Sequence, residues 1–86
     1  MNDAELSLKI KELMIRELDL SDLTPAQIDD GGALFGEGLG LDSLDALQLA
    51  IALEEEFGVT IPEGEEAKPI FASVNAIALH ITQQRS

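Results

Sequence analysis

The chain has 86 residues, no cysteine and a formal charge of −12, with 17 Asp and Glu against five Lys and Arg. This length predicts one small domain spanning residues 1–86, and the missing cysteine excludes disulfides and thiolate metal sites. The negative charge disfavours nucleic acids and anionic membrane surfaces as partners and favours proteins that carry a basic patch.

The first part of the chain predicts an amphipathic helix over residues 3–18. The first residues of the chain are acidic and contain no apolar run. We therefore expect no secretory signal and no membrane insertion, and we expect a cytoplasmic location. Asp3 stands where a helix N-cap is expected. Apolar residues recur at helical spacing and predict a core-facing stripe: Leu6, Ile10, Leu13, Met14 and Leu18.

Residues 19–41 predict a long first loop, and they hold five of the seven glycines in the chain. A loop of this length in a compact domain is usually functional or anchored. Within it, Thr24, Pro25 and Gln27 predict one helical turn, because Thr is a good cap, Pro suits the first helical position and Gln can reach back to the cap. Apolar side chains are expected to hold the loop against the core: Leu20, Leu23, Ile28, Leu34 and Phe35.

A second helix is predicted over residues 43–57, with Gly58 as a left-handed stop. Asp42 and Asp45 are three residues apart and can cap the first turn from both sides, which places Ser43 at an exposed helix N-terminus. One apolar stripe should face the core: Ala46, Leu49, Ala50, Leu53 and Phe57. A second apolar line must border a pocket, contact a partner or be covered by a bundle that surrounds the helix: Leu44, Leu47 and Ile51.

The C-terminal third predicts an extended segment, a short helix and a last helix. Residues 59–62 should be extended, since Pro62 disfavours a helical conformation in the residue before it. A short helix is predicted over residues 63–67. Ser73 should cap the last helix, and a frayed tail is expected over residues 83–86. The core face of that helix is predicted from its spacing: Val74, Ile77, Ala78 and Ile81. Three principal helices plus short helical turns predict an all-α bundle.

The residues around Ser43 carry a family resemblance. The run Gly40-Leu41-Asp42-Ser43-Leu44 precedes an amphipathic helix that closes in Glu54-Glu55-Glu56-Phe57-Gly58. This combination resembles the acyl carrier proteins with their Asp-Ser-Leu attachment motif, and it implies the small acyl-carrier-like fold with its long first loop, as a single, discrete (type II) carrier domain. Independently of the resemblance, the positive end of a helix dipole and its unpaired N–H groups suit a phosphate on the Ser43 hydroxyl.

The resemblance implies a carrier function. A phosphopantetheinyl transferase would attach 4′-phosphopantetheine from coenzyme A to Ser43, with Asp42 shaping the helix start and helping a transferase-bound magnesium ion to find the site. The arm would carry acyl intermediates as thioesters to ketosynthase- or acyltransferase-type enzymes with basic patches, in fatty acid, polyketide or related lipid biosynthesis. The chain itself would not be an enzyme, would hold no metal ion and would act as a monomer.

The resemblance also implies a docking surface and a shelter for the acyl chain, both built around the second helix. Six residues would dock on partners: Leu44, Asp45, Gln48, Ile51, Glu54 and Glu55. Five residues are candidates for the acyl-chain lining, with an ordinary core position as the alternative for each: Leu47, Ile51, Leu53, Phe57 and Ile61. Gln48 stands where fatty-acid carriers commonly have Glu, and Gly38, Leu41 and Pro69 also depart from their pattern. A dedicated carrier for polyketide or polyene-like metabolism therefore fits at least as well.

Other functional classes fit these residues less well. A nucleophile elbow needs Gly two positions before and after the serine, where Leu41 and Asp45 stand. His80, the single possible histidine base, is expected at the solvent edge of the last helix. No stretch has the alternating oxygen ligands of a calcium loop. A peptidyl or aminoacyl carrier domain and a non-carrier acidic helical interaction module stay open as alternatives, and neither the acyl chain, the pathway nor the cognate enzymes follow from the sequence.

Overall fold

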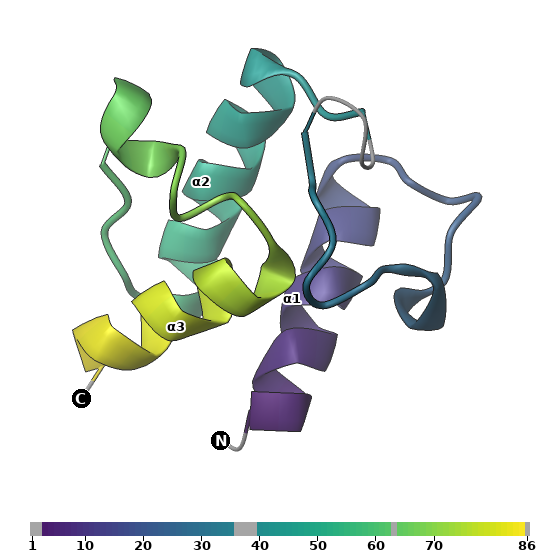
Figure 1. Ribbon diagram of the computed structural model, residues 1–86, viewed down its shortest axis with the longest axis horizontal. Coiled ribbons are helices and arrows are strands. Elements are labelled where there is room, and N and C mark those ends of the chain that lie inside the picture. The colour runs from purple at the N-terminus through teal and green to yellow at the C-terminus, as the bar shows by residue number, and fades with distance from the viewer. Residues whose placement is uncertain (1–2, 36–39, 63, 86) are drawn as a thin grey trace.

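A computed structural model describes residues 3–35, 40–62 and 64–85. Its frame consists of three helices: α1 (Asp3–Glu17), α2 (Ser43–Phe57) and α3 (Val74–Arg85) (Figure 1). Two short 3-10 helices lie in the connections: η1 (Pro25–Gln27) and η2 (Gly64–Ala67). The only other regular pairing among the described residues is one isolated β-bridge, between Phe35 and Leu41. The predicted all-α architecture with a long first loop is confirmed, and none of the described helices is both long and apolar enough to cross a bilayer.

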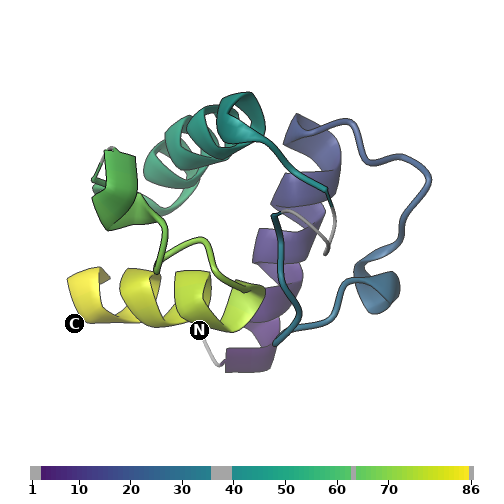
Figure 2. The same cartoon turned by 45° about the horizontal axis from the view of Figure 1, so that its top comes forward.

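The helix α1 packs against both α2 and α3 (Figure 2). Four of the five predicted stripe residues are buried, while Leu18, just past the helix end, is half-buried. The prediction of Asp3 as N-cap is wrong, because Asp3 is already helical and a cap lies outside the helical turn. The residues before it lie outside the described part of the chain. Leu8, which falls outside the stripe, is exposed.

The long first loop is anchored to the helices at several points. In η1, the Thr24 N–H donates to Gln27 Oε1 at 2.8 Å, which confirms the predicted turn. Further along, Asp30 forms an ion pair with Lys11 of α1, and its carbonyl accepts from the Asn75 N–H of α3 at 2.9 Å. All five apolar residues predicted to hold the loop are buried in or packed against the core: Leu20, Leu23, Ile28, Leu34 and Phe35. Residues 36–39, including two of the predicted loop glycines, lie outside the described residues.

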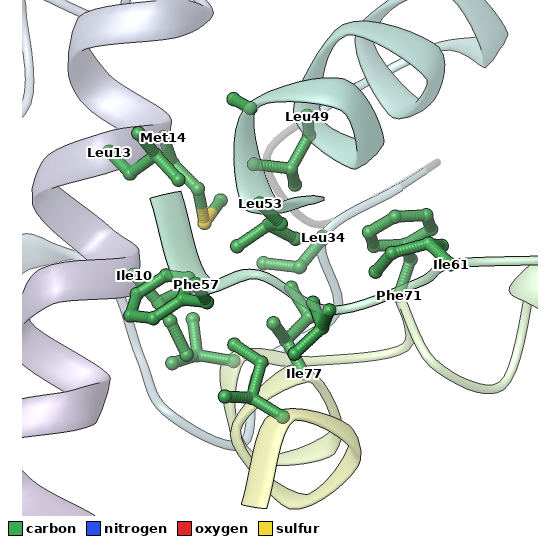
Figure 3. Close-up of a cluster of buried hydrophobic side chains, with 14 of the residues drawn as sticks. Ile10, Leu13, Met14, Leu34, Leu49, Leu53, Phe57, Ile61, Phe71 and Ile77 are labelled. Carbon is green, nitrogen blue, oxygen red and sulfur yellow. The ribbon is translucent and has the colours of Figure 1, made fainter. Parts of the chain in front are cut away.

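The core is one apolar cluster to which all three helices contribute (Figure 3). The side chains labelled in Figure 3 come from the helices and from the connections between them: Ile10, Leu13, Met14, Leu34, Leu49, Leu53, Phe57, Ile61, Phe71 and Ile77. Ala52, which is absent from the predicted stripe of α2, is also buried. Ala46 and Ala50 of the predicted stripe are half-buried, so the buried side of α2 is shifted from that stripe toward Ala52.

The segment between α2 and α3 is bounded at each end by a local hydrogen bond. Gly58 has φ 68° and ψ 29°, and its N–H donates to the Glu54 carbonyl at 3.0 Å, which confirms the left-handed stop. Ser73 Oγ accepts from the Ala76 N–H at 3.1 Å and caps α3 as predicted. The expected fraying of residues 83–85 is wrong, because α3 continues through Arg85. The side-chain amide of Gln84 is bonded to the backbone of Thr60, and this contact gives the last turn a tertiary partner.

Candidate functional site

Ser43 is the first residue of α2 and is exposed. The chain approaches it through Gly40, whose φ of 75° lies in the left-handed region that glycine adopts without strain. Leu41 follows and is buried, and its N–H donates to the Leu34 carbonyl at 3.3 Å. Because Leu41 fixes the approach in the core, the next two residues turn outward. Ser43 thus stands at the surface, at the positive end of the α2 dipole.

The start of α2 is fixed by a reciprocal capping box. Asp42 Oδ1 accepts from the Asp45 N–H, and Asp45 Oδ2 accepts from the Asp42 N–H, both at 3.0 Å. Asp42 has the extended conformation of an N-cap, with φ −115° and ψ −173°. The predicted double cap is therefore confirmed. Since Asp42 and Asp45 make the capping bonds, the cap does not depend on the hydroxyl of Ser43.

Asp42→Ala is expected to lower the free energy of unfolding by about 1 kcal/mol, the usual cost of a lost N-cap side chain. The variant leaves the Asp45 N–H without its side-chain acceptor. Urea denaturation followed by far-UV circular dichroism measures the change. Asp42→Asn is the matched control, because an Asn oxygen can accept the same bond and should restore most of the stability. Equal unfolding midpoints for Asp42→Ala and the unsubstituted protein would contradict the capping role.

An open, mostly apolar cavity of about 1080 Å³ lies beside the start of α2. Asp42, Ser43, Glu65 and Lys68 are its charged or hydroxyl-bearing lining residues. The rest of the described lining is aliphatic, aromatic or glycine: Ala33, Leu34, Phe35, Leu41, Ala46, Leu47, Ala50, Pro62, Gly64, Ala67, Phe71 and Ala72. These residues come from the first loop, from the first half of α2 and from the segment around η2. The cavity thus brings apolar surface next to Ser43.

Comparison with known proteins identifies the family. Residues 9–81 match the family described as Phosphopantetheine attachment site. The chain belongs to the acyl carrier protein family. It is 41% identical over 68 residues to the acyl carrier protein of Thermosynechococcus vestitus, an alignment that covers 79% of each chain. It is 39% identical over 72 residues to that of Wolinella succinogenes, covering 84% of this chain and 87% of the relative.

A further relative comes from a plant. The chain is 43% identical over 67 residues to acyl carrier protein 2, mitochondrial, of Arabidopsis thaliana, and the alignment covers 76% of this chain and 48% of that relative. The relatives thus include bacterial and mitochondrial acyl carrier proteins.

The phosphopantetheine attachment domain of acyl carrier proteins carries a covalently attached 4′-phosphopantetheine, and the geometry at the start of α2 fits such a group. Ser43 is exposed, so a phosphodiester on its hydroxyl would need no burial of charge. The N–H groups of the first turn and the helix dipole favour negative charge at this point. The adjoining cavity offers apolar surface to a chain that folds back toward the core.

Three of the docking candidates lie on one side of α2 and are exposed: Leu44, Ile51 and Glu55. Leu44 is 75% exposed and Ile51 is 49% exposed, and Glu55 is exposed as well. These side chains are therefore accessible from solvent on this side of α2.

The other three docking candidates make hydrogen bonds within the chain. Asp45 belongs to the capping box, Gln48 Nε2 donates to the carbonyl of Glu17 at the end of α1, and Glu54 Oε2 accepts from the N–H of Ile61 at 2.9 Å. Sequence reasoning missed the last two bonds because the partners are 31 and seven residues apart. Gln48 has an amide N–H to donate to that carbonyl, which the carboxylate of a Glu lacks.

The predicted acyl-chain lining differs from the lining of the cavity. Of its five residues only Leu47 borders the cavity. Leu53, Phe57 and Ile61 belong to the buried core cluster, and Ile51 is exposed on the outer side of α2. Helical spacing identified these positions as apolar, but it could not separate the core from a cavity whose wall comes largely from the loop and from the segment around η2.

Two aromatic residues of the cavity wall were not predicted as lining residues from the sequence. Phe35 lies in the first loop and Phe71 follows η2, and their ring centroids are 6.2 Å apart with an interplanar angle of 68°. This edge-to-face arrangement is a favoured one for aromatic pairs. No local sequence signal joins two phenylalanines that are so far apart in the chain, so only the tertiary structure pairs them.

Proposed function

We propose that this acyl carrier protein carries acyl groups as thioesters on a 4′-phosphopantetheine arm attached to Ser43, and delivers them to enzymes of fatty acid, polyketide or related lipid biosynthesis. The observation that carries the proposal is the position of Ser43, exposed at the N-terminus of α2 and bordering an apolar cavity. The arm supplies the thiol, because the chain has no cysteine. The chain's own part is to hold and present the acyl group, without catalysing a reaction.

Each group at the start of α2 has a task in this function. The capping box of Asp42 and Asp45 keeps the first turn rigid, so the Ser43 hydroxyl is presented to a phosphopantetheinyl transferase in one orientation. We infer that Asp42 also helps a transferase-bound magnesium ion to approach, since it is exposed and adjacent to the hydroxyl. The dipole of α2 stabilises the phosphodiester. The cavity shelters the apolar cargo from water.

Loading and intact mass test the proposal. Incubation with coenzyme A, magnesium and a broad-specificity transferase should add the mass of one phosphopantetheine and one titratable thiol to a protein that otherwise has none. An unchanged mass with several transferases would contradict the proposal. Protein purified from its native host would show the cargo by intact mass: an aminoacyl group would favour the peptidyl carrier alternative, and an acyl chain would favour the function proposed here.

We propose that partner enzymes contact α2 through Leu44 and Ile51 and are attracted by its carboxylates. A formal charge of −12 draws a basic partner surface over distances of about a Debye length, roughly 30 Å at 10 mM salt and 10 Å at 100 mM. Long-range attraction raises the association rate, while a small apolar contact gives orientation without tight binding. Both properties suit a protein that must leave each enzyme after transfer.

Glu55→Lys is expected to slow acyl transfer to a partner enzyme several-fold at about 10 mM salt and much less at high salt, because salt screens the lost attraction. The measurement is the transfer rate across a salt series. Glu12→Lys on α1 is the matched control, since Glu12 is also exposed and the charge change is the same. A defect of Glu55→Lys that does not depend on salt, or an equal defect of Glu12→Lys, would contradict a steering role of α2.

A further inference from the structure

The segment 59–62, between α2 and η2, has no regular secondary structure and no neighbouring strand among the described residues. Val59 and Ile61 point into the core and are each 5% exposed, while Thr60 between them is exposed. The N–H of Ile61 is bonded in a part-buried position, where a polar group without a hydrogen bond is costly, and the exposed backbone of Thr60 is bonded as well. Side chains from the C-terminal parts of α2 and α3 provide the partners in these bonds.

The partner on the α3 side is mainly one amide. Gln84 Oε1 accepts from the Thr60 N–H at 2.8 Å, and Gln84 Nε2 donates to the Thr60 carbonyl at 3.0 Å. This pair of bonds imitates the way in which a neighbouring strand would pair with Thr60. His80, which is half-buried, places Nε2 at 2.9 Å from the same carbonyl oxygen. The last two turns of α3 thus bind the segment from one side.

The partner on the α2 side is a carboxylate. Glu54 Oε2 accepts from the Ile61 N–H at 2.9 Å in a part-buried position. A hydrogen bond to a charged acceptor is stronger than one between neutral groups. Glu54 is half-buried, whereas its neighbours Glu55 and Glu56 are exposed. Within this run of three glutamates, Glu54 is therefore turned toward the chain's own backbone.

The segment leads directly into the cavity wall. Seven residues of this region line the cavity: Pro62, Gly64, Glu65, Ala67, Lys68, Phe71 and Ala72. None of the residues of η2 is buried. The position of this wall therefore depends on the buried residues that anchor it, Ile61 before it and Phe71 within it. Any loosening of Ile61 should move the wall.

We propose that Glu54 and Gln84 are positioning residues for the acyl group: they fix the segment 59–62 and, through it, the wall of the cavity formed by Pro62 and η2. This inference rests on the proposed function, because it takes the cavity as the shelter of the acyl chain. It assigns Glu54 a task inside the molecule, which is to hold Ile61 through a hydrogen bond. This task is distinct from the attraction of partners by exposed carboxylates. In this role neither residue contacts Ser43 or takes part in attaching the arm.

Two substitutions separate the hydrogen bond from the charge. Glu54→Gln removes the charge but keeps an oxygen that can accept from the Ile61 N–H, whereas Glu54→Ala removes both. Glu55→Ala is the matched truncation at an exposed neighbour. Gln84→Ala provides an independent variant on α3, where the bonded N–H belongs to Thr60. The amide of Ile77, in the buried part of α3, serves as an internal reference for global unfolding.

The first readout is amide hydrogen exchange in the protein without its arm. Glu54→Ala should speed exchange at Ile61 by roughly tenfold relative to Ile77, since a buried N–H loses its acceptor. Gln84→Ala should do the same at Thr60. Glu54→Gln keeps a neutral acceptor and should speed exchange clearly less than Glu54→Ala, and Glu55→Ala should have no effect at Ile61. Unchanged exchange at Ile61 in folded Glu54→Ala would overturn the proposal.

The second readout is the cleavage of an octanoyl thioester on the loaded protein by hydroxylamine, which measures access to the sheltered group. Glu54→Ala and Gln84→Ala should speed cleavage several-fold, and Glu54→Gln and Glu55→Ala should not. Faster exchange at Ile61 with unchanged cleavage would overturn the link to the cargo. Failure to load Ser43 would instead contradict the proposed function, and the exchange experiment, which needs no arm, would still test the contact.

Discussion

Ser43→Ala is expected to abolish attachment of the phosphopantetheine arm completely. The substitution removes the oxygen that would form the phosphodiester, and no other group at the start of α2 can replace it. The helix should persist, because the capping bonds come from Asp42 and Asp45 and alanine is the best helix former. After incubation with coenzyme A, magnesium and a transferase, intact mass should be unchanged and thiol titration should find no thiol.

Ser73→Ala is the matched control for this experiment. Ser73 also stands at a helix start, but its Oγ accepts from the Ala76 N–H and caps α3. Its loss should cost about 1 kcal/mol of stability and leave loading complete. Loading of Ser43→Ala, or a failure to load Ser73→Ala while it is still folded, would show that the arm is attached elsewhere than at Ser43.

Leu53→Ala is expected to lower the free energy of unfolding by about 2–5 kcal/mol. Leu53 is 0% exposed and lies within the core cluster of Figure 3, so its truncation removes apolar contacts and leaves a cavity. Domains of this kind are stable by only about 5–15 kcal/mol in total, so the loss is a large fraction. Urea denaturation followed by far-UV circular dichroism is the suitable measurement, because the chain has neither Trp nor Tyr.

Leu47→Ala removes the same atoms from the same helix and serves as the control. Leu47 is 54% exposed and borders the open cavity, so its truncation should change stability by no more than about 0.5 kcal/mol. The pair tests the division of α2 into a core side and an exposed apolar line. Equal destabilisation by the two variants would contradict that division.

Features whose partners lie within one helical turn could be predicted from the sequence. Asp42 and Asp45 were predicted to cap α2 because their spacing alone brings each carboxylate to the other's N–H, and the same logic gave the turn at Thr24 and the stop at Gly58. Helical periodicity also predicted most of the core. Two local predictions were wrong, the N-cap at Asp3 and the frayed tail over residues 83–85, and both concern helix ends, which are weakly specified by sequence.

Contacts between residues far apart in the chain could not be predicted in this way. The family resemblance placed Gln48 and Glu54 among the docking residues, yet both are bonded within the chain. Leu53 and Phe57 were predicted both for the core stripe of α2 and as candidates for the acyl lining, and the structure places them in the core. The spacing of apolar residues shows which side of a helix is apolar. It does not show what covers that side.

The sequence by itself determined the three helices, the N-caps of α2 and α3, the family and the exposed position of Ser43, because each depends on spacings of a few residues or on a short motif. Only the tertiary structure decided which segments enclose the cavity and which polar side chains bind the backbone of segment 59–62. The physical reason is that these contacts join segments separated by many residues, and chain folding alone brings them within hydrogen-bonding distance.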